Sequence, residues 1–121
     1  MNKQQTQQQT QQTQPVLKGI GASPGFAKGS VRVVNGQEDA QQFQRGDILV
    51  APMTDPSMVM MMNKAEAIIT DRGGRTSHAA IIARELGIPC IVATQHATTT
   101  LQTGMMIELN GTTGEIKLIT I

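Results

Sequence analysis

Short apolar runs separated by polar segments recur along the chain from Val16 onward, and their lengths are typical of strands. The runs that we expect to form strands cover residues 17–21, 29–34, 47–51, 67–70, 88–93, 105–109 and 115–119. Asn35-Gly36 is a turn dipeptide that follows the second run. The last two runs flank the turn residues 110–114, which predicts a terminal hairpin.

Helical signals lie between these runs. Residues 38–43 form a plausible short helix, and a second helix begins at Asp55-Pro56-Ser57, where an N-cap residue precedes a proline, and runs to about residue 64. A third helix extends from Ser77 to Leu86 and ends at Gly87. Strands and helices alternate in the middle of the chain and both ends are rich in strands, so the pattern predicts a mixed α/β domain.

Residues 1–15 differ from the rest in composition. Gln and Thr dominate them, and they contain no Ile, Leu, Val or Phe. Such a segment has no apolar surface whose burial would offset the entropy lost on ordering. We therefore expect residues 1–15 to be a disordered leader and residues 16–121 to form one folded domain.

Charge and composition exclude several classes of function. The net charge is +1 and aromatic residues make up 2% of the chain, so we expect no nucleic-acid partner. No apolar run reaches 18 residues and no signal-type stretch opens the chain, so we expect no membrane partner. The single cysteine, Cys90, lies in an apolar run and is interpreted as a core residue. One cysteine gives no internal disulfide, and the expected location is the cytoplasm.

Four methionines within residues 58–62 form the least usual local composition. Met58, Met61 and Met62 have the spacing of one helical face, which favours packing in the core. Met60 falls outside that face and is a candidate for a docking surface. We expect no functional role for two other polar features. The Arg84-Glu85 pair is interpreted as exposed charges on the third helix, and His96 as a solvated loop residue.

The segment that carries candidate chemistry begins where residues 67–70 lead into Gly73-Gly74. A helix follows at once, with His78 in its first turn. Paired glycines permit positive φ and let backbone N–H groups approach a ligand closely. The N-terminus of a helix presents unpaired N–H donors and the positive end of the helix dipole. Together these features predict an anion site.

Three further side chains of this loop suit a phosphate. The hydroxyls of Thr76 and Ser77 either cap the helix or bind phosphate oxygens, and the Arg75 guanidinium can engage two oxygens at once. A histidine in this setting is a candidate phosphoryl acceptor, His78 here. The residues alone leave a simpler interpretation open, in which Thr76 or Ser77 only caps the helix and His78 is incidental.

Other phosphate and metal chemistries lack their motifs. The sequence contains no G-x-x-x-x-G-K-[ST], which excludes a P-loop. The only histidines are His78 and His96, and neither forms a ligand pair with Cys90 at a spacing that zinc sites use. We therefore expect no metal site in this chain.

The run Gly73-Gly74-Arg75-Thr76-Ser77-His78, within residues 70–89, closely resembles the phosphohistidine "swivelling" (mobile) domain of phosphoenolpyruvate (PEP)-utilising enzymes. That group includes phosphoenolpyruvate synthase, pyruvate phosphate dikinase and enzyme I of the sugar phosphotransferase system. Residues 21–25, 46–50 and 110–114 and the pair Asp55-Pro56 extend the resemblance to about residues 17–119. Within the group, the chain is most similar to the synthase branch.

The resemblance implies a β/β/α swivelling fold, with mixed sheet layers and short helices. It implies that His78 is phosphorylated on a ring nitrogen within a loop lined by Gly73, Gly74, Arg75, Thr76 and Ser77. The histidine then moves between an ATP-binding partner and a partner that binds pyruvate or PEP. No cofactor is expected on this domain itself, and Mg and ATP are expected on the partner domain.

Three positions depart from the family's usual pattern. Arg72 stands where an acidic residue is common, Ala93 where glycine is common, and Asn110 where aspartate is common. None of them removes the histidine. Arg72 is the departure that bears on how the loop meets a partner.

Two functions of different class follow. The first is a phosphoryl carrier, a non-autonomous component of a phosphotransferase of the phosphoenolpyruvate synthase or pyruvate dikinase type. The second is a regulatory or binding module that keeps the anion pocket and transfers nothing. An autonomous enzyme is the weakest alternative, because the chain holds no ATP-binding signature, no acidic magnesium cluster and no barrel for a second substrate.

Overall fold

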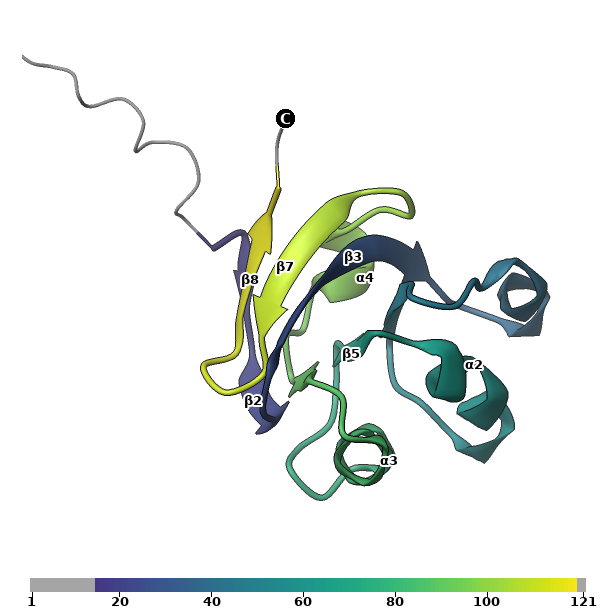
Figure 1. The fold of residues 1–121 in the computed structure, drawn as a ribbon, viewed down its shortest axis with the longest axis horizontal. Helices are drawn as coiled ribbons and strands as arrows, with labels where there is room; N and C mark the ends of the chain where they lie inside the picture. The colour runs from purple at the N-terminus through teal and green to yellow at the C-terminus, as the bar shows by residue number, and fades with distance from the viewer. Residues whose placement is uncertain (1–14, 120–121) are drawn as a thin grey trace, which may run out of the picture.

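The computed structural model describes residues 15–119, so the expected disorder of the leader concerns residues that lie, apart from Pro15, outside this range. Eight strands form one mixed sheet in the order β1-β8-β7-β3-β4-β5-β6-β2 (Figure 1). The strands are β1 (Leu17–Lys18), β2 (Ile20–Ser23), β3 (Phe26–Val33), β4 (Ile48–Ala51), β5 (Ala67–Thr70), β6 (Cys90–Val92), β7 (Met106–Asn110) and β8 (Glu115–Leu118). The helices are η2 (Gln37–Gln42), η3 (Pro56–Met58), α2 (Val59–Lys64), α3 (His78–Leu86) and α4 (Ala97–Thr100).

The long strand β3 joins two halves of the sheet that differ in direction. Its first part pairs antiparallel with β7, from Phe26 opposite Asn110 to Ser30 opposite Met106. Its last part pairs parallel with β4, which continues into parallel β5 and β6. Parallel strands need crossover connections, and the segments that carry α2 and α3 supply two of them.

The sheet curls into a nearly closed barrel. Strands β1 and β2 stand at opposite ends of the strand order, yet they follow one another in the chain through Gly19. The Gly19 amide donates to the Gly114 carbonyl at 2.9 Å. Gly114 has φ +85°, and a Cβ there would overlap the carbonyl oxygen of Gly19. Glycine is therefore required where the two ends of the sheet meet.

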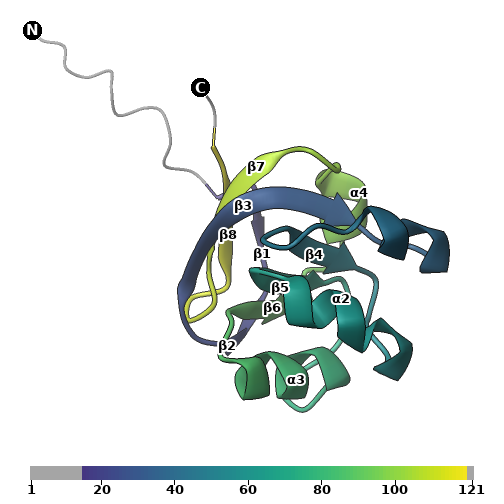
Figure 2. The same cartoon turned by 45° about the vertical axis from the view of Figure 1, so that its right-hand side comes forward.

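Alternate residues of the parallel strands pack into two separate cores. Ile48, Val50 and Ile69 face the barrel interior, where the antiparallel strands and α4 cover them. Leu49 and Ile68 face the opposite side, where α2 and α3 pack against them. Figure 2 shows the helices α2 and α3 on that outer side of the parallel strands. The result is three layers, β/β/α, and it confirms the predicted fold class.

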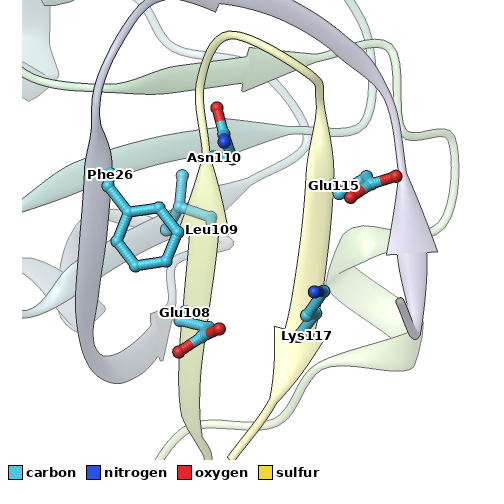
Figure 3. A pocket seen from close by; sticks show the side chains of 6 residues that line it. All are labelled: Phe26, Glu108, Leu109, Asn110, Glu115 and Lys117. Atoms are coloured by element: carbon cyan, nitrogen blue, oxygen red, sulfur yellow. The ribbon is translucent and has the colours of Figure 1, made fainter. Parts of the chain in front are cut away.

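The outer face of the antiparallel strands carries a row of charged side chains. Glu108 of β7 stands between Lys28 of β3 and Lys117 of β8, so that opposite charges face each other across the strands. Figure 3 shows the hollow on this face, where the exposed Phe26 ring lies beside Glu108 and Leu109. Its volume is about 50 Å³, which accommodates one or two water molecules.

Most of the predicted elements are present, and four differences stand out. Strand β3 begins at Phe26, three residues before the predicted strand 29–34. The first predicted strand is split at Gly19 and continues to Ser23, because barrel closure bends the chain there. The segment 37–42 is a 3-10 helix. The polar loop predicted around His96 contains the short helix α4, whose residues Ala97 to Thr100 are mostly β-branched and carry little helical propensity. Burial of Ala97 and Leu101 in the inner core stabilises this helix.

Across the described part of the chain, no helix is long and apolar enough to cross a membrane. The interpretation of Met58, Met61 and Met62 as core residues is confirmed, since Met61 and Met62 are buried and Met58 packs against the outer core. Met60, the candidate for a docking surface, is 71% exposed.

Candidate functional site

His78 is the first residue of α3, directly after the glycine loop that leaves β5. The helix buries Ala79, Ala80 and Ala83 against the sheet. Gly87, with φ +74°, ends it in the left-handed conformation, as the sequence predicted. The small alanines let α3 lie close to the sheet, which fixes the position of its N-terminus.

The imidazole of His78 is held by a residue that the sequence analysis did not single out. The Thr54 hydroxyl oxygen lies 2.8 Å from His78 Nδ1, and Thr54 is buried whereas His78 is half-buried. The His78 Nε2 atom has no hydrogen-bond partner among residues 15–119. Thr54 immediately precedes the Asp55-Pro56 helix start, and that position was the only sequence signal for it.

Asp55 places a negative charge near this pair. Its carboxylate accepts hydrogen bonds from the amide and the hydroxyl of Ser57, which caps the start of η3 as the sequence predicted. These two bonds lower the pKa of the Asp55 carboxyl, and the charge of His78 lowers it further. Asp55 is therefore ionised at neutral pH beside the histidine.

The carbonyl groups of the glycine loop are bound by donors of the surrounding structure. The Thr70 hydroxyl donates to the Arg72 carbonyl, and the Ser77 hydroxyl donates to the Gly74 carbonyl, each at 2.7 Å. The Arg84 guanidinium donates to the Arg75 carbonyl, also at 2.7 Å. Three carbonyl dipoles of the loop are thus directed at partners within the protein.

The amide groups of the same loop have the opposite arrangement. Within residues 15–119, the N–H groups of Gly73, Gly74, Arg75 and Thr76 donate to no acceptor, and the same holds for the first three N–H groups of α3. Gly73 has φ +125°, a conformation that side chains disfavour. The loop is therefore rich in free donors and poor in free acceptors, which is the arrangement that binds anions.

The loop side chains divide into two groups. Arg75 and Thr76 are exposed, and their side chains form no hydrogen bond within the described residues. Ser77 stands at the N-cap position of α3, but its hydroxyl does not cap the helix and bonds the Gly74 carbonyl instead. The predicted site residues Gly73 to Ser77 thus form the loop before α3, His78 begins that helix, and the structure adds Thr54 to the site.

Arg84 is exposed on α3, as predicted, but its guanidinium is also hydrogen-bonded to the backbone. Its guanidinium donates to the carbonyls of Ala22, at 2.8 Å, and Arg75. His96 is exposed, and its carbonyl accepts the Thr100 amide at the start of α4.

Hydrogen bonds also link Asp71, at the start of the loop, to α4. The Asp71 carboxylate accepts from the Thr98 amide at 3.0 Å and from the Thr98 hydroxyl at 2.6 Å. The connecting segment contains two non-glycine residues with positive φ, Ala93 at 59° and Gln95 at 72°. The left-handed conformation of Ala93 gives a physical reason for the glycine that is common at this position in the family.

A groove of about 630 Å³ adjoins the Thr54 segment. It is lined by Val34, Asn35, Gly36, Ala40, Gln41, Pro52, Met53, Asp55, Ser57, Met58, Met60 and Met61. Met53 and Met60 are 56% and 71% exposed, so flexible thioether side chains border the site.

The positions of the described side chains do not point to a metal site or to a reactive thiol. In residues 15–119, no group of three or more His, Cys, Asp or Glu side chains is arranged to hold a metal ion. Cys90 is fully buried in the outer core, as predicted, and burial raises the pKa of its thiol to about 12. A thiol in that state is a core residue and not a nucleophile.

The three β/β/α layers and the histidine behind a glycine loop define a small domain with a candidate anion site at the start of a helix. Residues 43–114 match the family model described as "PEP-utilising enzyme, mobile domain", and the chain belongs to this family.

The sequence is also similar to curated proteins whose names fit this family. The chain is 50% identical over 107 residues to a phosphoenolpyruvate synthase of Pyrococcus furiosus, and 46% identical over 110 residues to one of Aquifex aeolicus. These matches cover 88% and 91% of this chain but 13% of each relative. The chain thus spans about one eighth of the length of the curated relatives that it matches.

Solved structures resemble the fold. An NMR structure of an enzyme I protein (nEIt) has a TM-score of 0.58 and 28% identity, over 68% of this chain and 34% of that one. Aconitase X of Thermococcus kodakaraensis has a TM-score of 0.64 and 21% identity, over 86% of this chain and 98% of that one. The second likeness shows the fold alone, because this architecture serves unrelated chemistries.

Proposed function

We propose that this chain is a phosphoryl carrier in which His78 Nε2 accepts a phosphoryl group and passes it on. The observation that carries the proposal is the contact between Thr54 Oγ1 and His78 Nδ1. It occupies one ring nitrogen with a buried hydroxyl and leaves the other as the available nucleophile. A ring held in this way needs no reorientation when the donor arrives.

The reaction is a displacement at phosphorus. With the proton on Nδ1 and Thr54 Oγ1 as its acceptor, the Nε2 lone pair forms the new P–N bond. The bond between phosphorus and the donor's leaving oxygen breaks, and that oxygen keeps the bonding electron pair. The ring proton stays on Nδ1, where the hydroxyl oxygen stabilises the positive charge that the imidazole gains. Transfer to an acceptor is the reverse displacement.

The loop supplies the electrostatic part of the mechanism. Free amides of Gly73, Gly74 and Thr76, together with the N-terminus of the nine-residue helix α3, offer donors and a positive potential for the phosphoryl oxygens. The exposed Arg75 guanidinium adds a bidentate donor. We infer that the negative charge of Asp55, the ionised neighbour of His78, limits the stabilisation of the phosphoryl group. Limited stabilisation suits a carrier, because a carrier must release the phosphoryl group to its acceptor.

The carrier needs partners, which are either other domains or separate proteins. We assign ATP and Mg to an ATP-binding partner, and pyruvate or PEP to a second partner, as family membership suggests. The sequence itself contains no P-loop and no acidic magnesium cluster.

The decisive experiment is phosphoryl labelling. The full chain is incubated with labelled PEP or ATP and with partner domains from a phosphoenolpyruvate synthase. The expected label is labile in acid and stable in alkali, as a P–N bond should be. It should be absent in His78→Ala and present in His96→Ala, the matched control, because His96 is an exposed histidine at the start of a different helix.

Label that survives His78→Ala would contradict the proposal. Absence of any label, combined with binding of the chain to the partner domains, would favour the regulatory module instead.

A further inference from the structure

Arg84 lies further along α3 than His78, and its guanidinium turns back to the helix start. Nη2 donates to the Arg75 carbonyl at 2.7 Å, and Nη1 donates to the Ala22 carbonyl at 2.8 Å. One planar group therefore joins α3, the glycine loop and β2. The donors of a guanidinium have a fixed relative geometry, so this pair of bonds sets the position of the Arg75 carbonyl.

The anchor for Arg84 is a β-bulge. Strand β2 pairs with β6 through Gly21 opposite Ile91 and Ser23 opposite Cys90, and the register shifts between these pairs. Ala22 is the extra residue, without a partner in β6. Bulges often redirect a backbone group next to a functional site. Here the Ala22 carbonyl accepts the Arg84 guanidinium.

The Arg75 carbonyl is the third carbonyl of the loop that is bound within the protein, after those of Arg72 and Gly74. Thr70 and Ser77, which bind the first two, are short hydroxyl side chains within three residues of them. Arg84 reaches the third from another element, nine positions away in sequence. A free carbonyl in this loop would direct partial negative charge toward the bound phosphoryl group.

We propose that Arg84 is a positioning residue of the carrier. It holds the Arg75 carbonyl away from the phosphoryl group, and so keeps the neighbouring amides available as donors. This role rests on the proposed function. Arg84 does not contact the reacting atoms, because its guanidinium is committed to two backbone carbonyls.

The test uses the full chain and a small donor, phosphoramidate, and therefore no partner protein. His78 Nε2 forms a bond to phosphorus, and the bond from phosphorus to the amino nitrogen breaks. Ammonia leaves with the bonding pair and a proton from solvent. The rate is followed by ³¹P NMR in the wild type, Arg84→Met, Arg84→Lys and Arg45→Met. Arg45→Met is the matched control, because it removes the same charge from an exposed arginine outside the site.

We expect Arg84→Met to slow phosphorylation roughly tenfold, less than the loss of a direct donor to the reacting group. Arg84→Lys should recover only part of the rate, because an ammonium keeps the charge but not the fork. Arg45→Met should match the wild type. Titration with inorganic phosphate, read from the amide NMR shifts of residues 73–76, should show correspondingly weaker binding in Arg84→Met.

Two results would overturn the role of Arg84: phosphorylation and phosphate binding in Arg84→Met equal to those in Arg45→Met, or full recovery in Arg84→Lys. If Arg84→Met does not fold, the phosphorylation rate of Arg84→Lys is compared with that of the wild type. A reduced rate in Arg84→Lys supports the role of Arg84, and an equal rate overturns it. Failure of wild-type His78 to take up phosphate would contradict the carrier function instead, and the phosphate titration would still test Arg84.

Discussion

Thr54 Oγ1 lies 2.8 Å from His78 Nδ1, although the two residues are 24 positions apart in sequence. Thr54 belongs to the segment between β4 and η3, and His78 begins α3. The Asp55 cap fixes the chain directly after Thr54. The relationship therefore depends on two helix starts that are brought together above neighbouring parallel strands.

Replacing Thr54 with valine should separate this contact from the fold. Valine has nearly the volume of threonine, so little cavity forms, but the ring loses its Nδ1 partner. We expect phosphorylation of His78 to slow about 10- to 100-fold, the effect typical of removing the residue that orients a functional histidine. Thr54→Ser keeps the hydroxyl and should keep most of the rate. Initial labelling rates and melting curves measure both effects. Equal rates in Thr54→Val and the wild type would show that the ring orients itself without the hydroxyl.

Arg75→Ala should slow phosphorylation much more than it destabilises the protein. The side chain is exposed, and such substitutions usually change the free energy of unfolding by no more than about 0.5 kcal/mol. Loss of a bidentate donor to the transferring phosphoryl group should cost about 10²–10³ in rate. Arg75→Lys should restore part of it. Phosphorylation rates with a partner domain test this, and an unchanged rate in Arg75→Ala would mean that the loop amides suffice.

Ala93→Gly should stabilise the protein. Ala93 has φ +59°, and the left-handed conformation costs a residue with a Cβ about 1 kcal/mol relative to glycine. For a domain of this size, relief of that strain should raise the melting temperature by about 4–8 °C. Ala83→Gly, in the middle of α3, is the control and should lower it, because glycine costs about 1 kcal/mol inside a helix. A lower melting temperature for Ala93→Gly would show that the alanine methyl contributes more by packing than the conformation costs.

Cys90 should make folding sensitive to alkali. Burial raises the pKa of its thiol to about 12 in the folded state, from 9.0 for an unhindered thiol. The folded state therefore holds the proton more tightly, so this contribution to stability is complete below pH 9 and declines as the pH rises toward 12. Between pH 8 and 10.5 we expect the wild type to lose about 2 kcal/mol more than Cys90→Ala.

Denaturant unfolding at the two pH values measures this difference. The native thiol should also resist alkylation at pH 8, where an exposed cysteine reacts. Identical pH dependence in the wild type and Cys90→Ala would mean that the thiol ionises without leaving the core.

The three departures from the family pattern have different structural meanings. Asn110 accepts the amides of Thr112 and Thr113 through its side-chain oxygen, a role that aspartate fills equally. Ala93 carries a conformational cost, as argued above. Arg72 is exposed, and its side chain forms no hydrogen bond within the described residues, so it adds a cation to the face that carries the loop.

The sequence by itself determined the features that depend on near neighbours. Strand β5 was predicted with its observed ends, and the Asp55 and Gly87 helix boundaries follow from local capping chemistry. Gly73 to Ser77 form the loop that leads into His78 at the start of α3. These features depend on hydrogen bonds and steric preferences over a few residues, and the local sequence is enough to determine such short-range interactions.

Only the tertiary structure decided what surrounds His78. The partner of its Nδ1 comes from another crossover, and Arg84 reaches across 62 positions to Ala22. Barrel closure splits the first strand at Gly19, and burial of Ala97 and Leu101 makes a helix from residues with little helical propensity. All four depend on the register and curvature of the sheet. The register and curvature are set by the packing of residues 15–119 into two cores, which no local sequence pattern shows.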